Sequence, residues 1–356
     1  MRARDVAAAV LEARRTGRKL RLRGAASAGR DSFPASDTLW LGDLEGAPSL
    51  DVENLSVSLP ASYRLGQLQA ELLEHGLFYP PAMDLDSDQS VGSHLATGSC
   101  GPWRTGRGTA RDWVLGLEVV TGQGDLIRTG SGVVKNVAGL DLTRLVIGSR
   151  GGLCAITGAT LRLAPLPEAT AVVAAEFAGP VAALGALPEL LRSQLNPGAL
   201  ALDGSRLVVG LEGTRADLPR RTGWAEGVLK GAGGKLLLEG VARLKAPWGA
   251  PVSLPPGRVA VRAGLPAARG VEWVGALPGG APVRGHAGSG IYHALLPADP
   301  SLLTSLADLA QRLGGYMLVE SENPALLRRP AGVERLEALV GRAFDPDQIF
   351  IGGGKG

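Results

Sequence analysis

Apolar residues at the start of the chain recur at the spacing of a helix. Val6, Ala9, Val10 and Ala13 have this spacing, which predicts an amphipathic helix. Gly17 follows the last of them and is expected to end the helix. Polar and apolar residues then alternate from Lys19 to Arg23, as in a half-buried strand.

Short apolar or alternating runs continue through the first half of the chain. They predict strands at Thr38–Leu41, Ser56–Leu59, Leu115–Val120, Leu126–Arg128 and Cys154–Leu163. Between them, Leu65, Leu68 and Leu72 recur at helical spacing and predict a second helix. Pro165 and Pro167 follow the last strand and are expected to stop it.

Beyond about residue 167 strands alternate with helices in a different manner. The predicted strands are Val172–Phe177, Leu207–Glu212, Val259–Ala263, Ile291–Leu296 and Tyr316–Glu320, and the predicted helices cover about 180–194, 214–231 and 300–314. This order predicts an α+β domain with a mostly antiparallel sheet. We therefore place a domain boundary near residue 167.

Composition excludes several classes of protein. A chain of 356 residues is long enough for two domains, and a formal net charge of +3 without basic clusters argues against a nucleic-acid partner. No apolar run approaches the ~20 residues that cross a bilayer, and the first residues lack the apolar core of a secretory signal. Cys100 and Cys154 are the only cysteines, which favours a reducing cytoplasm over a disulfide framework.

The 52 glycines gather in part into three glycine-rich segments of the first half. The first, residues 24–29, offers converging backbone N–H groups and the Ser27 hydroxyl to an anion. The second, residues 90–101, looks too poor in bulky side chains to pack a core, and the third is residues 148–152. Each alone is a weak signal, but three within one domain predict a flat, elongated cofactor.

The stretch from Val91 to Pro167 also carries short motifs in a defined order. They are Gly-Thr-x-Arg-Asp at residues 108–112, Lys-Asn-x-x-Gly-x-Asp at 135–141 and Gly-Ser-x-Gly-x-Leu at 148–153. In this order the chain resembles the FAD-binding oxidoreductases of the vanillyl-alcohol oxidase / p-cresol methylhydroxylase (PCMH) fold. Within that fold it most resembles the E-type FAD-binding subunit of glycolate oxidase. The likeness covers about residues 18–167 and returns at Phe344–Gly354.

The resemblance implies a fold, a cofactor and its contacts. We expect a PCMH-type FAD-binding domain of two α/β subdomains at residues 1–167, an α+β cap domain at 168–340, and a segment at 341–356 that returns to the first domain. FAD is expected to be bound non-covalently, because residues 24–29 hold neither the histidine nor the cysteine that attaches flavin in some relatives. The implied FAD contacts are Gly24, Ala25, Ala26, Ser27, Ala28, Gly29, Ser90, Val91, Gly92, Ser93, Ala96, Thr97, Gly101, Arg107, Thr109, Asp112, Gly151, Gly152 and Ile156.

The chain departs from the family pattern at several of these positions. Ala25 and Ala26 replace adjacent glycines in the first loop, where alanine resists a positive φ. Ser93 stands where a second glycine is usual, and Leu140 replaces a tyrosine. These departures leave open a second interpretation, in which the fold is kept and FAD is lost.

Oxidation of a 2-hydroxy acid by a flavin needs a base for the hydroxyl proton and a cation for the carboxylate. Four histidines are available as the base. His75 is expected at a helix end, and His94 either approaches the flavin or makes a loop hydrogen bond. Arg243, Arg262 and Arg284 are candidates for the cation, and sequence does not rank them.

His286 and His293 lie in Gly-His-Ala-Gly-Ser-Gly-Ile-Tyr-His, where relatives carry Gly-His-x-Gly-Asp-Gly-Asn-x-His. The resemblance makes them candidate catalytic residues. Ser289 replaces the aspartate and Ile291 the asparagine, so we expect no metal. Residues seven apart in an unbroken strand point to opposite faces, so only a turn at residues 288–290 could bring the two imidazoles together. Two ordinary sheet histidines remain an equal alternative.

Three hypotheses about function follow. The first is a FAD-binding subunit of a glycolate oxidase-type complex, which oxidises glycolate to glyoxylate with a D-type flavin subunit and an iron–sulfur subunit; two cysteines cannot hold an iron–sulfur cluster here. The second is a stand-alone FAD-dependent D-2-hydroxy-acid dehydrogenase acting on a substrate such as D-lactate. The third is a scaffold subunit without FAD. In each case we expect a cytoplasmic protein, peripheral to a membrane only through its partners.

Overall fold

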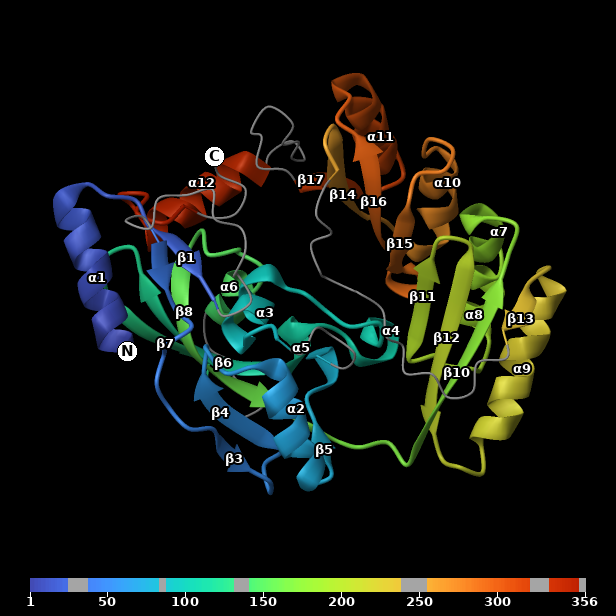
Figure 1. The fold of residues 1–356 in the computed structure, drawn as a ribbon, viewed down its shortest axis with the longest axis horizontal. Helices are drawn as coiled ribbons and strands as arrows, with labels where there is room; N and C mark the ends of the chain where they lie inside the picture. The colour runs from blue at the N-terminus through green and yellow to red at the C-terminus, as the bar shows by residue number, and fades with distance from the viewer. Residues whose placement is uncertain (25–37, 83–87, 131–140, 238–254, 321–332, 352–356) are drawn as a thin grey trace. The chain divides into compact units, whose positions relative to one another are not determined.

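The computed structural model describes residues 1–24, 38–82, 88–130, 141–237, 255–320 and 333–351. The chain forms two compact units (Figure 1). The first unit comprises Met1–Cys100, Thr109–Leu166 and Gly332–Gly356, and the second comprises Gly101–Gly108 and Pro167–Ala331. The long stretch of the second unit begins at Pro167, where the sequence suggests a boundary. The sequence does not suggest that residues 101–108 belong to the second unit.

A five-stranded antiparallel sheet lies at the centre of the first unit (Figure 1). Its strands, in spatial order, are β3 (Ser49–Asp51), β4 (Ser56–Pro60), β8 (Cys154–Arg162), β6 (Val114–Thr121) and β7 (Leu126–Gly130). Two pairs stand apart from this sheet: β1 (Arg21–Arg23) with β2 (Thr38–Trp40), and β5 (Leu77–Phe78) with β9 (Ala164–Pro165). The β1–β2 pair is parallel, whereas β5 and β9 are antiparallel.

The helices of this unit contribute apolar residues to its core, and the sequence predicts two of these apolar faces, those that contain Val6 and Leu65. They are α1 (Ala3–Thr16), α2 (Leu65–Glu74), α3 (Val91–Thr97), α5 (Ala110–Trp113), α6 (Leu142–Val146) and α12 (Val333–Phe344). In α1, Val6, Val10 and Ala13 are fully buried, and Gly17 ends the helix with φ of 67°. Both predictions for this helix are confirmed, because a left-handed terminal residue favours glycine.

The second glycine-rich segment is a helix rather than an extended loop. Val91 and Leu95 of α3 are fully buried in the core of the unit. The expectation that this segment is too poor in bulk to pack a core is therefore wrong. Gly92 and Ser93 alternate with these apolar residues, so one face of α3 packs inward while its small residues face a pocket.

The C-terminal segment is joined to the first unit by a buried carboxylate. Asp345 is 3% exposed, and its two oxygens accept from the backbone N–H groups of Ile349 and Phe350, each at 2.8 Å. Next to this turn, Leu20 donates from its N–H to the Ile349 carbonyl at 2.7 Å, and Ile351 donates to the Leu20 carbonyl at 2.8 Å. The segment thus lies beside the strand that follows α1.

We predict that Asp345→Ala lowers the free energy of unfolding by about 3 kcal/mol, because two buried N–H groups lose their acceptor. Asp347→Ala is the matched control, since Asp347 is half exposed and pairs with Arg14 on the surface. It should cost under about 1 kcal/mol. Urea unfolding of the two variants measures the difference, and equal losses would contradict the role given to Asp345.

The second unit is built on one eight-stranded sheet in which every neighbouring pair is antiparallel. In spatial order the strands are β13 (Lys235–Leu237), β10 (Ala169–Glu176), β12 (Arg206–Gly213), β11 (Ala199–Asp203), β15 (Val283–His286), β16 (Ile291–Pro297), β14 (Arg258–Gly264) and β17 (Tyr316–Glu320). The predicted α+β class with an antiparallel sheet is confirmed.

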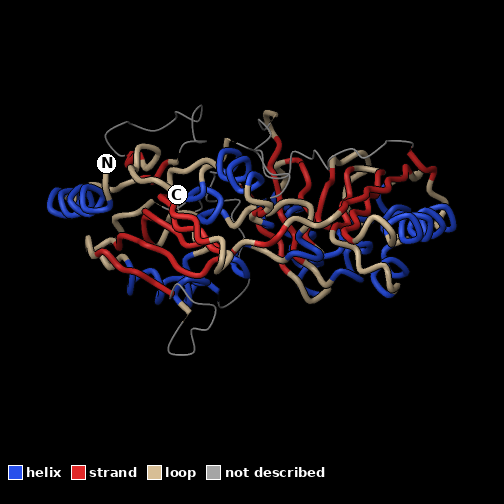
Figure 2. The backbone as a smooth tube through the Cα atoms, turned by 90° about the horizontal axis from the view of Figure 1, so that it is seen from below, coloured by secondary structure: helices blue, strands red, loops and turns tan. Residues whose placement is uncertain are grey.

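One face of this sheet carries the core of the unit. Alternate strand residues, such as Leu202, Val209 and Tyr292, are fully buried against helices on that side, which Figure 2 shows in blue. These helices are α7 (Pro180–Leu184), α8 (Leu187–Arg192), α9 (Leu218–Gly231), α10 (Gly270–Gly275) and α11 (Pro300–Arg312). Among the described residues, no helix is both long and apolar enough to span a bilayer.

Residues 101–108, with the short helix α4 (Arg104–Arg107), lie on the opposite face of the sheet. The Trp103 ring covers Gly210 of β12, where an added Cβ would lie 3.0 Å from the ring. Arg107 pairs with Glu212 of the same strand at 2.8 Å. Gly106 donates from its N–H to the Gly198 carbonyl at 2.8 Å. An aromatic contact, an ion pair and a backbone bond thus join this segment to the second unit.

Candidate functional site

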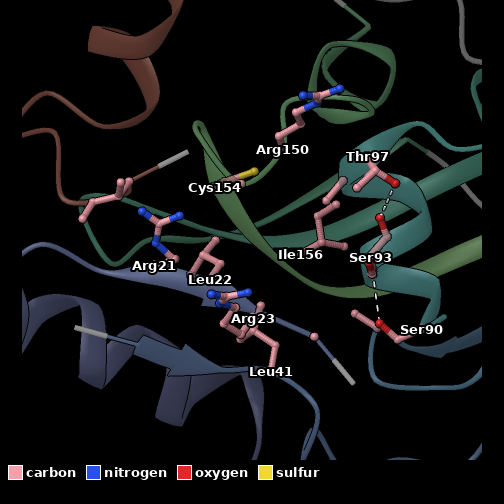
Figure 3. A pocket seen from close by; sticks show the side chains of 16 residues that line it. Arg21, Leu22, Arg23, Leu41, Ser90, Ser93, Thr97, Arg150, Cys154 and Ile156 are labelled. Carbon is pink, nitrogen blue, oxygen red and sulfur yellow. Dashed lines mark hydrogen bonds between the residues drawn. The ribbon is translucent and has the colours of Figure 1, made fainter. Parts of the chain in front are cut away.

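The first unit contains a pocket of about 310 Å³ (Figure 3). Strand β1 and helix α3 both contribute side chains to it, as do the turn before β8 and the strand β8 itself. Its lining residues are Arg21, Leu22, Arg23, Gly24, Leu41, Ala61, Ser90, Gly92, Ser93, Ala96, Thr97, Arg150, Gly151, Cys154, Ile156 and Ile351. All of them belong to the first unit.

Parts of all three glycine-rich segments meet at this pocket. A Cβ on Gly24, from the first segment, would lie 2.9 Å from Ser90 Oγ of the second. The third segment is joined to the second by its backbone, because Arg150 donates from its N–H to the Ala96 carbonyl at 2.7 Å. Gly151, with φ of 75°, lies beside Leu22 of β1. The glycines therefore leave room for neighbouring segments to lie close together around one cavity.

The lining has the two kinds of surface that a dinucleotide requires. Arg21, Arg23 and Arg150 bring positive charge to the pocket, and Ser93 and Thr97 bring hydroxyl groups. Guanidinium groups are well suited to phosphate because they offer several donors in a planar array. The pocket is also lined by four larger apolar side chains that could cover a flat ring system: Leu22, Leu41, Ile156 and Ile351. These residues fit a cofactor that combines a diphosphate with aromatic rings.

A thiol also lines this pocket. Cys154 is buried at the start of β8, and burial raises its pKa to about 12. The thiol therefore stays protonated at neutral pH, and protonated thiols are poor nucleophiles. Cys154 is a small apolar part of the wall.

The structure brings many of the predicted cofactor contacts together. Those that line the pocket are Gly24, Ser90, Gly92, Ser93, Ala96, Thr97, Gly151 and Ile156. Ala25, Ala26, Ser27, Ala28 and Gly29 lie outside the described residues, as do Lys135, Asn136 and Arg243.

The remaining predicted cofactor contacts do not line the pocket. Val91 is in the core of the unit, and Gly152 lies in the turn next to Gly151, where its N–H donates to the Ser149 carbonyl. Thr109 and Asp112 form a capping box at the start of α5, in which the Asp112 carboxylate accepts from the Thr109 N–H at 2.8 Å. Gly101 and Arg107 belong to the second unit.

Sequence reasoning missed the arginines of the pocket. Arg21 and Arg23 lie in the alternating run that predicts β1, and Arg150 lies inside the Gly-Ser-Arg-Gly-Gly-Leu motif. The signal that could have found them is their position directly beside glycine-rich turns. Ile351, from the C-terminal segment, also lines the pocket. Its N–H donates to the Leu20 carbonyl, which keeps it beside β1.

The two candidate catalytic histidines lie on one face of the second sheet. His286 ends β15, and His293 lies in β16 opposite Arg284. Between the strands, residues 287–289 form a 3₁₀ turn that ends at Gly290 with φ of 67°. In the resulting register the two histidines are diagonal neighbours across adjacent strands, because cross-strand partners share a face. The turn thus meets the condition on which the catalytic interpretation depends.

Positive side chains flank these histidines on the same face. Arg262 of β14 is the cross-strand partner of His293, and its Nε is buried without a hydrogen-bond partner among the described residues. Arg104 of α4 lies close enough to His286 to act on its charge. Within the described ranges, no three histidine, cysteine or carboxylate side chains form a group that could hold a metal ion. The face is therefore suited to a small anion.

His286 is kept neutral by its surroundings. Burial lowers its pKa to about 3, and the charges of Arg104 and His293 act in the same direction. The side chain is 5% exposed, whereas His293 is partly exposed. Of the two, His293 is better placed to meet a substrate from solvent, and His286 can act as a neutral hydrogen-bonding group beside it.

Comparison with known proteins agrees with this geometry. A family model described as a FAD binding domain matches residues 2–130. An uncharacterised FAD-linked oxidoreductase of Mycobacterium tuberculosis is 30% identical over 316 residues, which cover 75% of this chain and 68% of that protein. Glycolate oxidase subunit GlcD of Bacillus subtilis is 36% identical over 172 residues, or 48% of this chain and 36% of that one.

Two further relatives bear on the activity. The mitochondrial D-lactate dehydrogenase [cytochrome] of Arabidopsis thaliana is 40% identical over 129 residues, which are 36% of this chain and 22% of that protein. Glycolate oxidase subunit GlcE of Escherichia coli is 32% identical over 153 residues, or 43% of each chain, so the expected likeness to the E-type subunit is modest. The chain thus matches less than half the length of GlcD, GlcE or this dehydrogenase.

A solved structure agrees with the fold. A structure of alkyldihydroxyacetonephosphate synthase has a TM-score of 0.66 with this chain at 15% identity, covering 97% of this chain and 74% of the other. At that identity the comparison shows the PCMH-type fold alone. Together with the relatives above, it shows that this chain belongs to the FAD-linked oxidoreductases related to glycolate oxidase and D-lactate dehydrogenase, with FAD as its cofactor.

Proposed function

We propose that the chain is the FAD-binding subunit of a glycolate oxidase-type complex that oxidises a 2-hydroxy acid, glycolate in the first instance. The observation that supports this most is the pocket in which the glycine-rich segments meet three arginines. Similarity to GlcD and GlcE supports the choice of complex. A second flavin subunit and an iron–sulfur subunit would be its partners.

In this proposal the pocket of the first unit holds part of FAD without a covalent bond. Arg21, Arg23 and Arg150 would neutralise the diphosphate, while the apolar side chains of the lining cover ring surface. When bound, FAD supplies a hydride acceptor, N5 of the flavin. The protonated Cys154 thiol has no part in attaching the cofactor.

The histidines and arginines of the second sheet would handle the hydroxy acid. His293 would accept the hydroxyl proton of the substrate, and the flavin, when bound, would supply the acceptor for the hydride. Arg262, with its unpartnered Nε, binds the carboxylate, and Arg104 adds to the positive charge of the face. His286 stays neutral and orients the neighbouring groups.

We predict that Arg150→Met raises the dissociation constant for FAD about 10- to 100-fold, because a charge-assisted contact to phosphate is lost. Arg144→Met is the matched control, since Arg144 is 62% exposed on α6 and pairs with Asp141 rather than lining the pocket. Titration of the apoprotein with FAD, followed by flavin fluorescence, measures both. Equal affinities in the two variants would remove the pocket from the proposal.

Activity is tested by the visible spectrum of the purified chain, before and after anaerobic addition of glycolate or D-lactate. Bleaching by glycolate only after addition of the partner subunits supports a role within the complex. Bleaching of the isolated chain by D-lactate favours the stand-alone dehydrogenase, which the similarity to D-lactate dehydrogenase keeps as the second candidate. A flavin that neither substrate reduces in any combination would contradict both.

A further inference from the structure

A chain of hydrogen bonds connects the core of the first unit to the cofactor pocket through a fully buried histidine. His94 of α3 lies with Nε2 3.3 Å from the Tyr79 hydroxyl and Nδ1 3.0 Å from Ser99 Oγ. The Tyr79 ring, also fully buried, meets the imidazole edge-on. His94 does not line the pocket, yet Ser93 beside it does.

The last hydrogen bond of this series, at Thr97, determines which group donates and which accepts in the others. Thr97 Oγ1 donates to the Ser93 carbonyl at 2.7 Å, and a carbonyl oxygen can only accept. The Thr97 hydroxyl has one proton, so it accepts from Gln89 Nε2, 3.5 Å away. The amide oxygen of Gln89 therefore faces Ser99, and it accepts from Ser99 Oγ at 3.0 Å.

The direction of these bonds specifies the tautomer of the histidine. Because Ser99 donates its only proton to Gln89, its oxygen accepts from His94, and Nδ1 must carry the hydrogen. Burial lowers the pKa of His94 to about 4, so the ring holds a single proton at neutral pH. Nε2 then carries no hydrogen and accepts from the Tyr79 hydroxyl.

The C-terminal end of α3, which this series of hydrogen bonds holds in place, also positions the third glycine-rich segment. The Leu95 carbonyl accepts from the Gly148 N–H at 2.9 Å, and the Ala96 carbonyl accepts from the Arg150 N–H at 2.7 Å. Gly98 closes the helix with φ of 62°, and a Cβ there would lie 3.4 Å from the Gly148 Cα. Movement of the helix end would therefore displace Arg150 in the pocket.

We propose that His94 is a positioning residue for the cofactor: as the neutral Nδ1–H tautomer it holds Ser99 and Gln89, and through them the end of α3 that presents Thr97 and Arg150 to the pocket. The inference rests on the proposed function only in taking the pocket of the first unit as the FAD site. His94 itself touches neither cofactor nor substrate, and it acts through the segment that it orders.

Affinity for FAD is the first test. Ser99→Ala breaks the chain at a partly buried side chain and should raise the dissociation constant for FAD about five- to tenfold, the equivalent of one lost hydrogen bond. Ser58→Ala, which removes a hydroxyl bonded to Thr160 on the five-stranded sheet, is the matched control and should leave FAD binding unchanged. Ser99→Ala should also lower the thermal unfolding temperature, because the buried Nδ1–H of His94 loses its acceptor, whereas Ser58→Ala should change it little.

Rescue separates positioning from simple packing. His94→Leu fills similar space without a donor and should weaken FAD binding, whereas His94→Asn places an N–H group near the position of Nδ1 and should recover much of the affinity. Equal FAD affinity of the Leu and Asn variants would overturn the proposal. So would an unchanged affinity in Ser99→Ala.

Nitrogen NMR of the histidine-labelled apoprotein is a readout that does not require FAD. It should show the proton of His94 on Nδ1, and a proton on Nε2 would overturn the proposal. The outcomes also separate the two claims. If Arg150→Met binds FAD normally, the pocket is not the FAD site; if Arg150→Met is weakened and Ser99→Ala is not, only the role of His94 fails.

Discussion

Replacement of His293 by alanine should lower the rate of 2-hydroxy-acid oxidation by about 10²–10⁴-fold, the range lost when a general base is removed. His293 is partly exposed on the face of the second sheet that also carries α4, and Arg262 and Arg284 are its cross-strand partners. The loss should fall on kcat, because the proton must leave the hydroxyl in the step that forms the carbonyl. Stopped-flow reduction of the flavin by the substrate measures this step.

Two comparisons make the result specific. His75→Ala alters an exposed histidine at the end of α2 and should react like the unsubstituted protein. His293→Ala should still bind FAD with unchanged affinity, since His293 lies in the second unit and the pocket in the first. Retention of full activity by His293→Ala would exclude it as the base and leave the two histidines as ordinary residues of the sheet.

Acid should destabilise both units through their buried histidines. Burial lowers the pKa of His94 to about 4 and that of His286 to about 3, against 6.5 for an unburied imidazole. Between the folded and unfolded pKa values only the unfolded chain binds the proton, so the free energy of unfolding falls as the pH drops below about 6.5. At about 1.4 kcal/mol for each pH unit, the loss by pH 4 is about 3 kcal/mol for either histidine.

The measurement is native-state hydrogen exchange between pH 7 and pH 4, read separately in the two units. His94→Gln should flatten the pH dependence of unfolding of the first unit and leave that of the second unchanged, because His286 belongs to the second. Above pH 7 neither histidine should affect the slope. A slope in the first unit that survives His94→Gln unaltered would show that other groups cause it.

Elements with strong local patterns could be predicted from sequence. The helix at residues 3–16 and the strand β8 have regular apolar spacing, and each formed close to its predicted bounds. Strands β11 and β15 were missed because Ala199–Asp203 and Val283–His286 are rich in alanine or interrupted by glycine, which have weak strand propensity. Their pairing with neighbouring strands decides their conformation, and that pairing is not local.

The candidate site could also be predicted only in part, at the level of segments rather than of single residues. Glycine-rich segments suggested the pocket, since small residues mark places where backbones approach closely, and Gly24, Gly92 and Gly151 all line it. Single residues could not be placed, because Val91 and Gly92 are neighbours in sequence and face opposite sides of α3. Which side of a short helix faces a cavity depends on the contacts of the whole unit.

The arrangement of residues 101–108 has a consequence for fragments and chimeras of this protein. The chain leaves the first unit after Cys100, contributes Trp103 and Arg107 to the second, and returns at Thr109. A fragment that ends at residue 167 would carry Trp103 without the sheet it covers, and a fragment that begins there would leave Gly210 and Glu212 uncovered. Exchange of the second unit between relatives therefore requires that residues 101–108 are exchanged together with residues 167–331.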